Sequence, residues 1–111
     1  MEVVTIKEVA PDDRPEIVMK TLFNETVTEG AKAVLGVVSI PPGARIPLQG
    51  TGSHEEDEYA VVTKGSIVTM SGGKEYEITS GQATFIPKGE EHWAYNKGTT
   101  DCEIIWTLVK R

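Results

Sequence analysis

The chain contains only two histidines, His54 and His92. His92 lies in the stretch GQATFIPKGEEHWAYN, residues 81–96, and His54 lies in GARIPLQGTGSHEEDEYAVVTKG, residues 43–65, four positions before Glu58. Composition gives no reason for so sparse a residue to fall within such patterns of glycine and proline, so we interpret both stretches as parts of a functional site. Imidazole and carboxylate groups gathered at one site are suited to binding a divalent metal ion.

The two stretches resemble the paired motifs of the cupin family, which read G-x5-H-x-H-x3,4-E-x6-G and G-x5-P-x-G-x2-H-x3-N. The second motif is matched at every defined position of residues 81–96. In the first motif, residues 43–65, His54 and Glu58 keep the family spacing to the closing glycine, and the family's first histidine is missing. Either motif alone is a weak signal, whereas the two together are specific.

The resemblance implies a divalent metal ion inside the barrel, bound by His54, Glu58 and His92 and helped by Gln49. Two histidines and one carboxylate with open positions are typical of non-haem iron(II) sites that activate dioxygen. A fourth donor from Gln49 would suit Zn, Mn, Ni or Fe acting as a Lewis acid on a substrate oxygen. The sequence does not choose among these metals. It also leaves open a degenerate cupin whose histidines are only packed or hydrogen-bonded.

Gln49 enters this set through the missing histidine. Counting five residues forward from Gly43 leads to Gln49, whereas counting back from His54 leads to Gly52, so the loop is about three residues longer than the family pattern. Gly52 has no side chain, but the amide oxygen of Gln49 is a neutral ligand that hard or borderline cations accept. Zinc-dependent phosphomannose isomerases, which are also cupins, are similar in placing a glutamine near this position.

The elements that position these residues are expected to be strands. Four residues on one straight strand cover roughly 13 Å, so His54 must lie off the strand that carries Glu58 if both contact one ion. The preceding Gly50-Thr51-Gly52-Ser53 supplies backbone for such a fold-back. Strict alternation through 92–96 predicts that His92, Ala94 and Asn96 face one way, with Asn96 holding the following turn.

The whole chain has the pattern of an all-β protein. Residues 3–9 and 32–40 are rich in β-branched residues, and residues 14–20 allow either a short helical turn or a strand. Further short strands are expected at 57–63, 66–70, 74–79, 82–87, 92–96 and 102–109, with turn signals between them. Such spacing predicts an antiparallel sandwich or barrel, and the resemblance implies a double-stranded β-helix, the jelly-roll cupin barrel.

Composition limits the remaining possibilities. A length of 111 residues with 39% hydrophobic content predicts one domain, residues 1–111, and a net charge of −6 argues against nucleic-acid binding. No apolar run approaches the roughly 20 residues that cross a bilayer, and no secretory signal is evident, so a cytoplasmic location is expected. Cys102 is the only cysteine and cannot form an intrachain disulfide.

Three functions from different classes follow from this site. The first is a metal-dependent enzyme, an oxygenase, isomerase or lyase, that acts on a small oxygen-bearing metabolite. The second is a ligand-sensing module that binds such a molecule without turnover, and the third is a scaffold. Cupins commonly pair through N-terminal strands, and the alternation in residues 3–9 fits an edge strand, so we expect a homodimer.

Overall fold

The computed structural model describes all residues from 1 to 111, and nearly every regular element in it is a strand. One turn of 3-10 helix, η1 (Ile6–Glu8), precedes nine strands. The strands are β1 (Val18–Phe23), β2 (Ala33–Ile40), β3 (Arg45–Ile46), β4 (Asp57–Lys64), β5 (Ser66–Ser71), β6 (Lys74–Thr79), β7 (Ala83–Ile86), β8 (His92–Tyr95) and β9 (Cys102–Val109). None of the helical segments has the length and apolar character that a bilayer-spanning helix needs.

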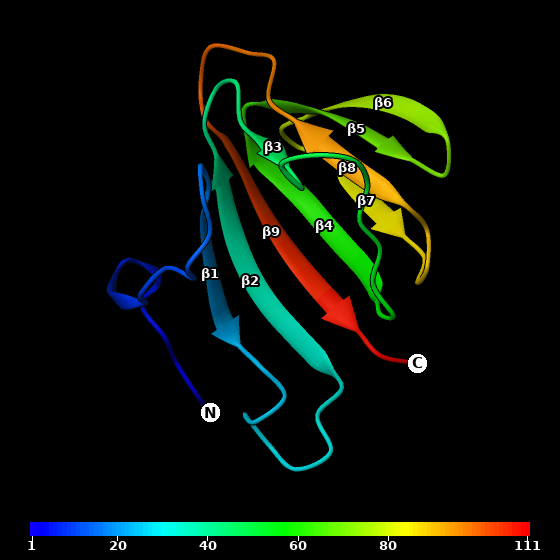
Figure 1. Ribbon diagram of the computed structural model, residues 1–111. Coiled ribbons are helices and arrows are strands. Elements are labelled where there is room, and N and C mark those ends of the chain that lie inside the picture. The colour runs from blue at the N-terminus through cyan, green and yellow to red at the C-terminus, as the bar shows by residue number, and fades with distance from the viewer.

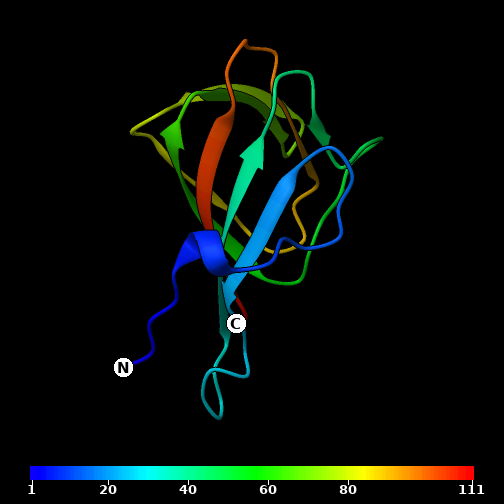
Figure 2. The ribbon, with the colours of Figure 1, turned by 90° about the vertical axis from the view of Figure 1, so that its left-hand side faces the viewer.

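The strands form two antiparallel sheets that face each other (Figure 1). The five-stranded sheet has the order β1-β2-β9-β4-β7, and the four-stranded sheet has the order β3-β8-β5-β6. Strands distant in sequence are therefore neighbours, as where β9 pairs with both β2 and β4. Figure 2, turned by 90°, shows the sheets curving around a common interior. This is the expected jelly-roll barrel, and the all-β prediction is confirmed.

Glycines make the tight turns between these short strands possible. The β5–β6 hairpin has a two-residue loop, Gly72-Gly73, with φ values of 60° and 83°. Two consecutive positive φ values suit the twist of a two-residue hairpin, and glycine adopts them without strain. At Gly65, between β4 and β5, φ is 75° and the backbone of Asp101 lies where a Cβ would be. A side chain at Gly65 is therefore excluded by both backbone conformation and space.

The core lies between the two sheets and is small. Its buried members are Ile17, Val38, Ile40, Ala44, Val62, Ile67 and Cys102. Ile40 and Cys102 face each other across β2 and β9 and are almost completely buried. The alternation of apolar residues along β2, β4 and β9 sends one face of each strand into this interior, as the period of a strand requires. The rest of the interior is a cavity.

One expectation about the N-terminal region needs correction. Residues 3–9 do not form a strand: Ile6–Glu8 is a 3-10 turn, and no strand pairs with the segment. Its alternation includes Lys7 and Glu8, and every one of these residues except Val9 is exposed, so there is no buried face to stabilise a strand. Of the two alternatives for residues 14–20, the strand is the one observed, since β1 begins at Val18. The short β3 was not expected.

Asn96 has the structural role that the sequence predicted. Its side chain is fully buried, and its amide nitrogen donates to the carbonyl oxygens of Ile40 and Thr100, each at 2.8 Å. Its amide oxygen accepts the backbone N–H of Gly98 at 2.9 Å. These bonds hold the turn that follows β8 against the end of β2.

Candidate metal centre

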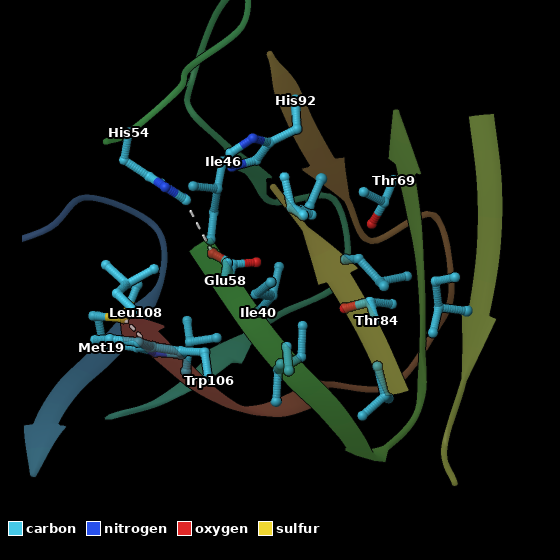
Figure 3. Close-up of a pocket in the computed structure, with 18 of the residues that line it drawn as sticks. Met19, Ile40, Ile46, His54, Glu58, Thr69, Thr84, His92, Trp106 and Leu108 are labelled. Atoms are coloured by element: carbon cyan, nitrogen blue, oxygen red, sulfur yellow. Dashed lines mark hydrogen bonds and ion pairs between the residues drawn. The ribbon is translucent and has the colours of Figure 1, made fainter. Parts of the chain in front are cut away.

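His54, Glu58 and His92 come together although they lie on three different segments (Figure 3). Glu58 is on β4, His92 begins β8 in the opposite sheet, and His54 lies in the loop that precedes β4. One nitrogen or oxygen donor from each residue lies within 4.8 Å of the other two donors. All three side chains are half-buried, and all three line the interior cavity.

The backbone around His54 explains how a residue four positions from Glu58 reaches the same place. Gly52 and His92 form an isolated antiparallel bridge, with N–H···O distances of 3.0 and 2.9 Å in the two directions. The backbone N–H of Gly89 donates to the carbonyl oxygen of His54 at 2.8 Å. The loop therefore folds back along the start of β8, and the expected position of His54 off the β4 strand is observed.

Main-chain carbonyl groups orient both imidazole rings. The Nδ1 atom of His54 lies 2.9 Å from the carbonyl oxygen of Glu56, and the Nδ1 atom of His92 lies 2.9 Å from that of Glu90. A carbonyl oxygen only accepts hydrogen bonds, so each Nδ1 must carry the hydrogen. Each Nε2 of the neutral ring then has a free lone pair, which is the form that binds a metal.

The Nε2 atom of His54 has no partner that satisfies it. The atom is buried, it makes no hydrogen bond, and it lies 3.4 Å from the Oε1 atom of Glu58. In the neutral tautomer no hydrogen lies between these two atoms, so a lone pair faces a negatively charged oxygen at close range. The His92 ring is also near, with its centroid 5.1 Å from that of His54. A cation among the three groups, a proton or a metal ion, removes this repulsion, so the donor set fits a divalent metal.

Gln49, the fourth ligand expected from the resemblance, is not brought to this place. It is exposed and does not line the cavity. Its loop is held from the other side by Arg45, whose Nη1 and Nη2 donate to the carbonyl oxygens of Pro47 and Gly50, both at 2.8 Å. The same guanidinium lies 5.1 Å from the ring centroid of Trp93. The guanidinium of Arg45 thus holds the loop.

The cavity beside the three residues has a volume of about 310 Å³ and is mostly apolar. Of its 21 lining residues 13 are hydrophobic, and they come from both sheets. The hydroxyl groups of Thr69 on β5 and Thr84 on β7 add polarity away from the histidines (Figure 3). Pockets that bind small molecules are typically of this size, apolar with a few polar groups.

Alternation along β8 predicted the inward residues correctly. His92 and Ala94 line the cavity, whereas Trp93 lies outside it under Arg45. Trp106 on β9 is also a lining residue.

The sequence reasoning missed Met19 and the two charged lining residues, Asp12 and Arg14. All three precede the cupin motifs, so motif spacing carried no signal for them. The strand pattern of residues 14–20 could have placed Met19.

A jelly-roll barrel with two histidines and a glutamate facing its interior defines the class of protein to which this chain corresponds. The family model described as "Cupin domain" matches residues 36–108, and the chain belongs to the cupin family. The match includes all three residues of the candidate metal centre. It begins after β1, so the N-terminal part of the cavity wall lies outside it.

Among curated proteins, the chain is 22% identical over 107 residues to the tetracenomycin polyketide synthase protein TcmJ of Streptomyces glaucescens. That match covers 95% of this chain and 69% of TcmJ. The mannose-1-phosphate guanylyltransferase of Klebsiella pneumoniae is 31% identical over 68 residues, 61% of this chain. The chain spans only 14% of that longer protein.

Among solved structures, a predicted oxalate decarboxylase from Thermotoga maritima has a TM-score of 0.87 and 25% sequence identity. The match covers 99% of this chain and 100% of that one. The polyketide cyclase RemF from Streptomyces resistomycificus has a TM-score of 0.81 and 22% identity, with coverage of 100% and 80%. These similarities agree with the observed fold.

Proposed function

We propose that this protein is a metal-binding cupin in which His54, Glu58 and His92 hold one divalent ion and a small oxygen-bearing metabolite binds beside it. The observation that carries the proposal is the buried, unpartnered Nε2 atom of His54, which faces a carboxylate oxygen at 3.4 Å. Leaving a buried polar atom unpaired costs about 1–3 kcal/mol, so such an atom calls for a partner. A metal ion held also by Glu58 and His92 supplies that partner.

The side chains of this chain define what the site can do. The three ligands approach from the loop before β4, from β4 and from β8, and all of them line the cavity, so coordination positions remain for a ligand there. A bound Fe, Mn, Ni or Zn ion would supply Lewis-acid chemistry to a substrate oxygen or, as iron(II), a site for dioxygen. The mostly apolar walls would reduce the water around that oxygen, and the hydroxyl groups of Thr69 and Thr84 can bind a second polar group of the ligand.

Catalysis is the function that this arrangement supports best, because a metal ion held by only three protein donors would have room for a substrate ligand in the cavity that those donors line. The named relatives include a polyketide synthase protein and a polyketide cyclase, and their names agree with an oxygen-bearing organic substrate. A second candidate is ligand binding without turnover. It is favoured by one observation: the only ionisable side chains lining the cavity, apart from the three ligands, are Asp12 and Arg14. A general base would have to come from Asp12 or from the ligands themselves.

We also infer a homodimer. The outer face of the five-stranded sheet exposes the large apolar side chains of Val18, Tyr59, Phe85 and Ile105, and the rings of Tyr59 and Phe85 lie 4.9 Å apart. A second copy is the occupant we propose for this face, in place of pairing through residues 3–9. A cytoplasmic location is an expectation that agrees with the free, buried thiol of Cys102.

The test is elemental analysis of the purified protein by plasma mass spectrometry, with His92→Ala and Gln49→Ala variants. We expect close to one metal ion per chain in the wild type, loss of the metal in His92→Ala, and full occupancy in Gln49→Ala, because Gln49 is exposed. Circular dichroism of both variants checks that they fold. Absence of metal from the wild type after incubation with iron, manganese, nickel and zinc salts would overturn the proposal.

A further inference from the structure

We propose that the ligand of this cavity is an organic carboxylate with an apolar body, and that Arg14 binds its carboxylate at the rim. This inference rests on the proposed function, because it names the class of molecule that the metal-binding cavity takes. Arg14 lies outside both cupin motifs and outside the part of the chain that the family model matches. It is the only lysine or arginine among the residues that line the cavity.

The guanidinium of Arg14 is free to bind an anion. The ion pairs of the chain involve His54, Lys97, Lys110 and Arg111, and Arg14 is in none of them. Its side chain makes no hydrogen bond either. An exposed arginine is often simply solvated, but this one borders a cavity whose other lining residues offer no positive charge except through the histidines. Guanidinium binds a carboxylate through two parallel hydrogen bonds, which lysine does not reproduce.

The segment that carries Arg14 is fixed to β1. The backbone N–H of Asp12 donates to the carbonyl oxygen of Met19 at 2.7 Å, and the backbone N–H of Arg14 donates to that of Asp12 at 2.9 Å. The hydroxyl group of Thr21 donates to the Oδ2 atom of Asp12 at 3.2 Å. Glu16 has a φ of 66°, the one non-glycine residue with positive φ, and it reverses the chain into β1. The carboxylate of Asp12 is thus bound to Thr21 and not to the guanidinium of Arg14.

An apolar surface adjoins both the segment of Arg14, through the bond from Asp12 to Met19, and the metal ligand Glu58, through its β9 partner Leu108. Met19, Trp106 and Leu108 lie side by side below His54 in Figure 3. The indole N–H of Trp106 donates to the sulfur of Met19 at 3.1 Å, which fixes the ring. Leu108 is the β9 partner of Glu58, so the surface adjoins the metal site directly. A ligand with an oxygen at the metal and a carboxylate at Arg14 would place an apolar body on this surface.

This arrangement favours an apolar carboxylate over a small, fully polar one. A molecule such as oxalate carries two charges and no apolar body. A cavity with 13 hydrophobic lining residues does not replace the hydrogen bonds to water that oxalate loses on binding. An aromatic acid with a second oxygen, such as 4-hydroxybenzoate, combines a carboxylate for Arg14, an apolar ring and an oxygen for the metal. Its neutral amide, 4-hydroxybenzamide, has the same shape without the charge.

The test is isothermal titration of the metal-free protein with these three compounds, because without metal a carboxylate has no ion to bind directly. We expect 4-hydroxybenzoate to bind about tenfold more tightly than 4-hydroxybenzamide, the preference that one charge-assisted hydrogen-bond pair gives. In Arg14→Gln that preference should disappear, and Arg14→Lys should recover part of it. Lys64→Gln is the matched control, since Lys64 is exposed and does not line the cavity.

The outcomes separate this inference from the proposed function. An unchanged preference in Arg14→Gln, equal binding of acid and amide by the wild type, tighter binding of oxalate, or no binding of either aromatic compound would overturn the role of Arg14. Thermal melting of each variant shows whether it is folded. Metal content is measured on each purified protein before its metal is removed for the titration: full occupancy in Arg14→Gln with a lost preference supports both proposals. A wild type that binds no metal but keeps the preference sinks the metal proposal alone.

Discussion

Arg111 binds the buried carboxylate of Asp57, with 2.5 Å between Nε and Oδ2. The other oxygen of Asp57 accepts the backbone N–H of Lys88 at 3.0 Å. One carboxylate thereby joins the segment after β9, the start of β4 and the loop after β7. Because Asp57 immediately precedes Glu58, these bonds also fix the position from which that metal ligand projects.

The Arg111–Asp57 pair predicts a pH-dependent stability. The hydrogen bond from Arg111 and then that from Lys88 hold the pKa of Asp57 below its usual value of 3.8. A carboxyl group whose pKa is lowered by folding stabilises the folded state above its unfolded pKa, and this contribution is lost as the pH falls through the lower folded pKa. Arg111→Gln should therefore lower the free energy of unfolding at pH 7, and the difference from wild type should shrink below pH 3.8. Urea denaturation of metal-free protein at several pH values measures it.

Lys97→Gln is the matched control for that experiment. Lys97 and Glu77 form an exposed pair with 3.4 Å between Nζ and Oε2. Such pairs contribute about 0–1 kcal/mol, so the variant should remain close to wild type at every pH. A loss of stability in Arg111→Gln that stays the same from pH 7 to pH 2.5 would show that the carboxylate of Asp57 is not the group responsible.

Metal binding should raise thermal stability. A ligand that binds only the folded chain stabilises it by about 2.7 kcal/mol at a concentration of 100 times its Kd. Calorimetry with added zinc should therefore raise the Tm of the wild type and leave that of His92→Ala unchanged, because this substitution removes one of three donors. An equal rise in both proteins would mean that zinc binds elsewhere.

The contact between Gly36 and Trp106 predicts that Gly36→Ala is harmful. The two residues are partners across β2 and β9, and a Cβ on Gly36 would overlap the Trp106 ring and lie 2.7 Å from the carbonyl oxygen of Lys20. Overpacking of this kind costs about 1–3 kcal/mol, and we expect the tryptophan emission spectrum to change as the indole is displaced.

Gly52→Ala is the control for this substitution. A Cβ there meets only Pro47, at ordinary distances of 3.9 and 4.0 Å. Equilibrium unfolding of both variants checks the prediction, which fails if Gly36→Ala unfolds at the same urea concentration as Gly52→Ala.

Cys102 should be unreactive in the folded protein. It is completely buried, and burial raises the pKa of its thiol to about 11, so little thiolate forms near neutral pH. Iodoacetamide at pH 8 should label it at least tenfold more slowly in buffer than in denaturant, since the thiolate is the nucleophile and unfolding exposes it. Rapid labelling of the native protein, followed by mass spectrometry, would contradict this.

Sequence patterns predicted most of the strands because burial on one face dictates their residues. β2, β4 and β9 each carry inward apolar residues at alternate positions, and β2 and β4 end directly before Pro41 and Gly65. The same logic failed for residues 3–9, where alternation occurs without a partner strand to bury either face. An alternating pattern shows that a segment could bury one face as a strand, but it does not show whether a neighbouring strand is there to pair with it.

The residues of the candidate site also differ in how far the sequence alone could predict them. His54, Glu58 and His92 belong to motifs whose spacing depends on the barrel itself. Gln49 was selected by counting along a loop, and counting does not reveal which way a loop side chain points. Arg14 lines the cavity because β1, which follows it, pairs with β2. No local sequence pattern indicates this pairing.

The carbonyl groups of Glu56 and Glu90 that fix the two imidazole rings belong to the main chain and not to any side chain. The path of the backbone therefore sets the orientation of the rings, and almost any residue at positions 56 and 90 supplies the same carbonyl oxygen. The two imidazole rings can therefore keep their orientation when the neighbouring residues are substituted. Changing the side chains at positions 56 and 90 should therefore disturb the orientation of the rings less than changing His54, Glu58 or His92 disturbs the donor set itself.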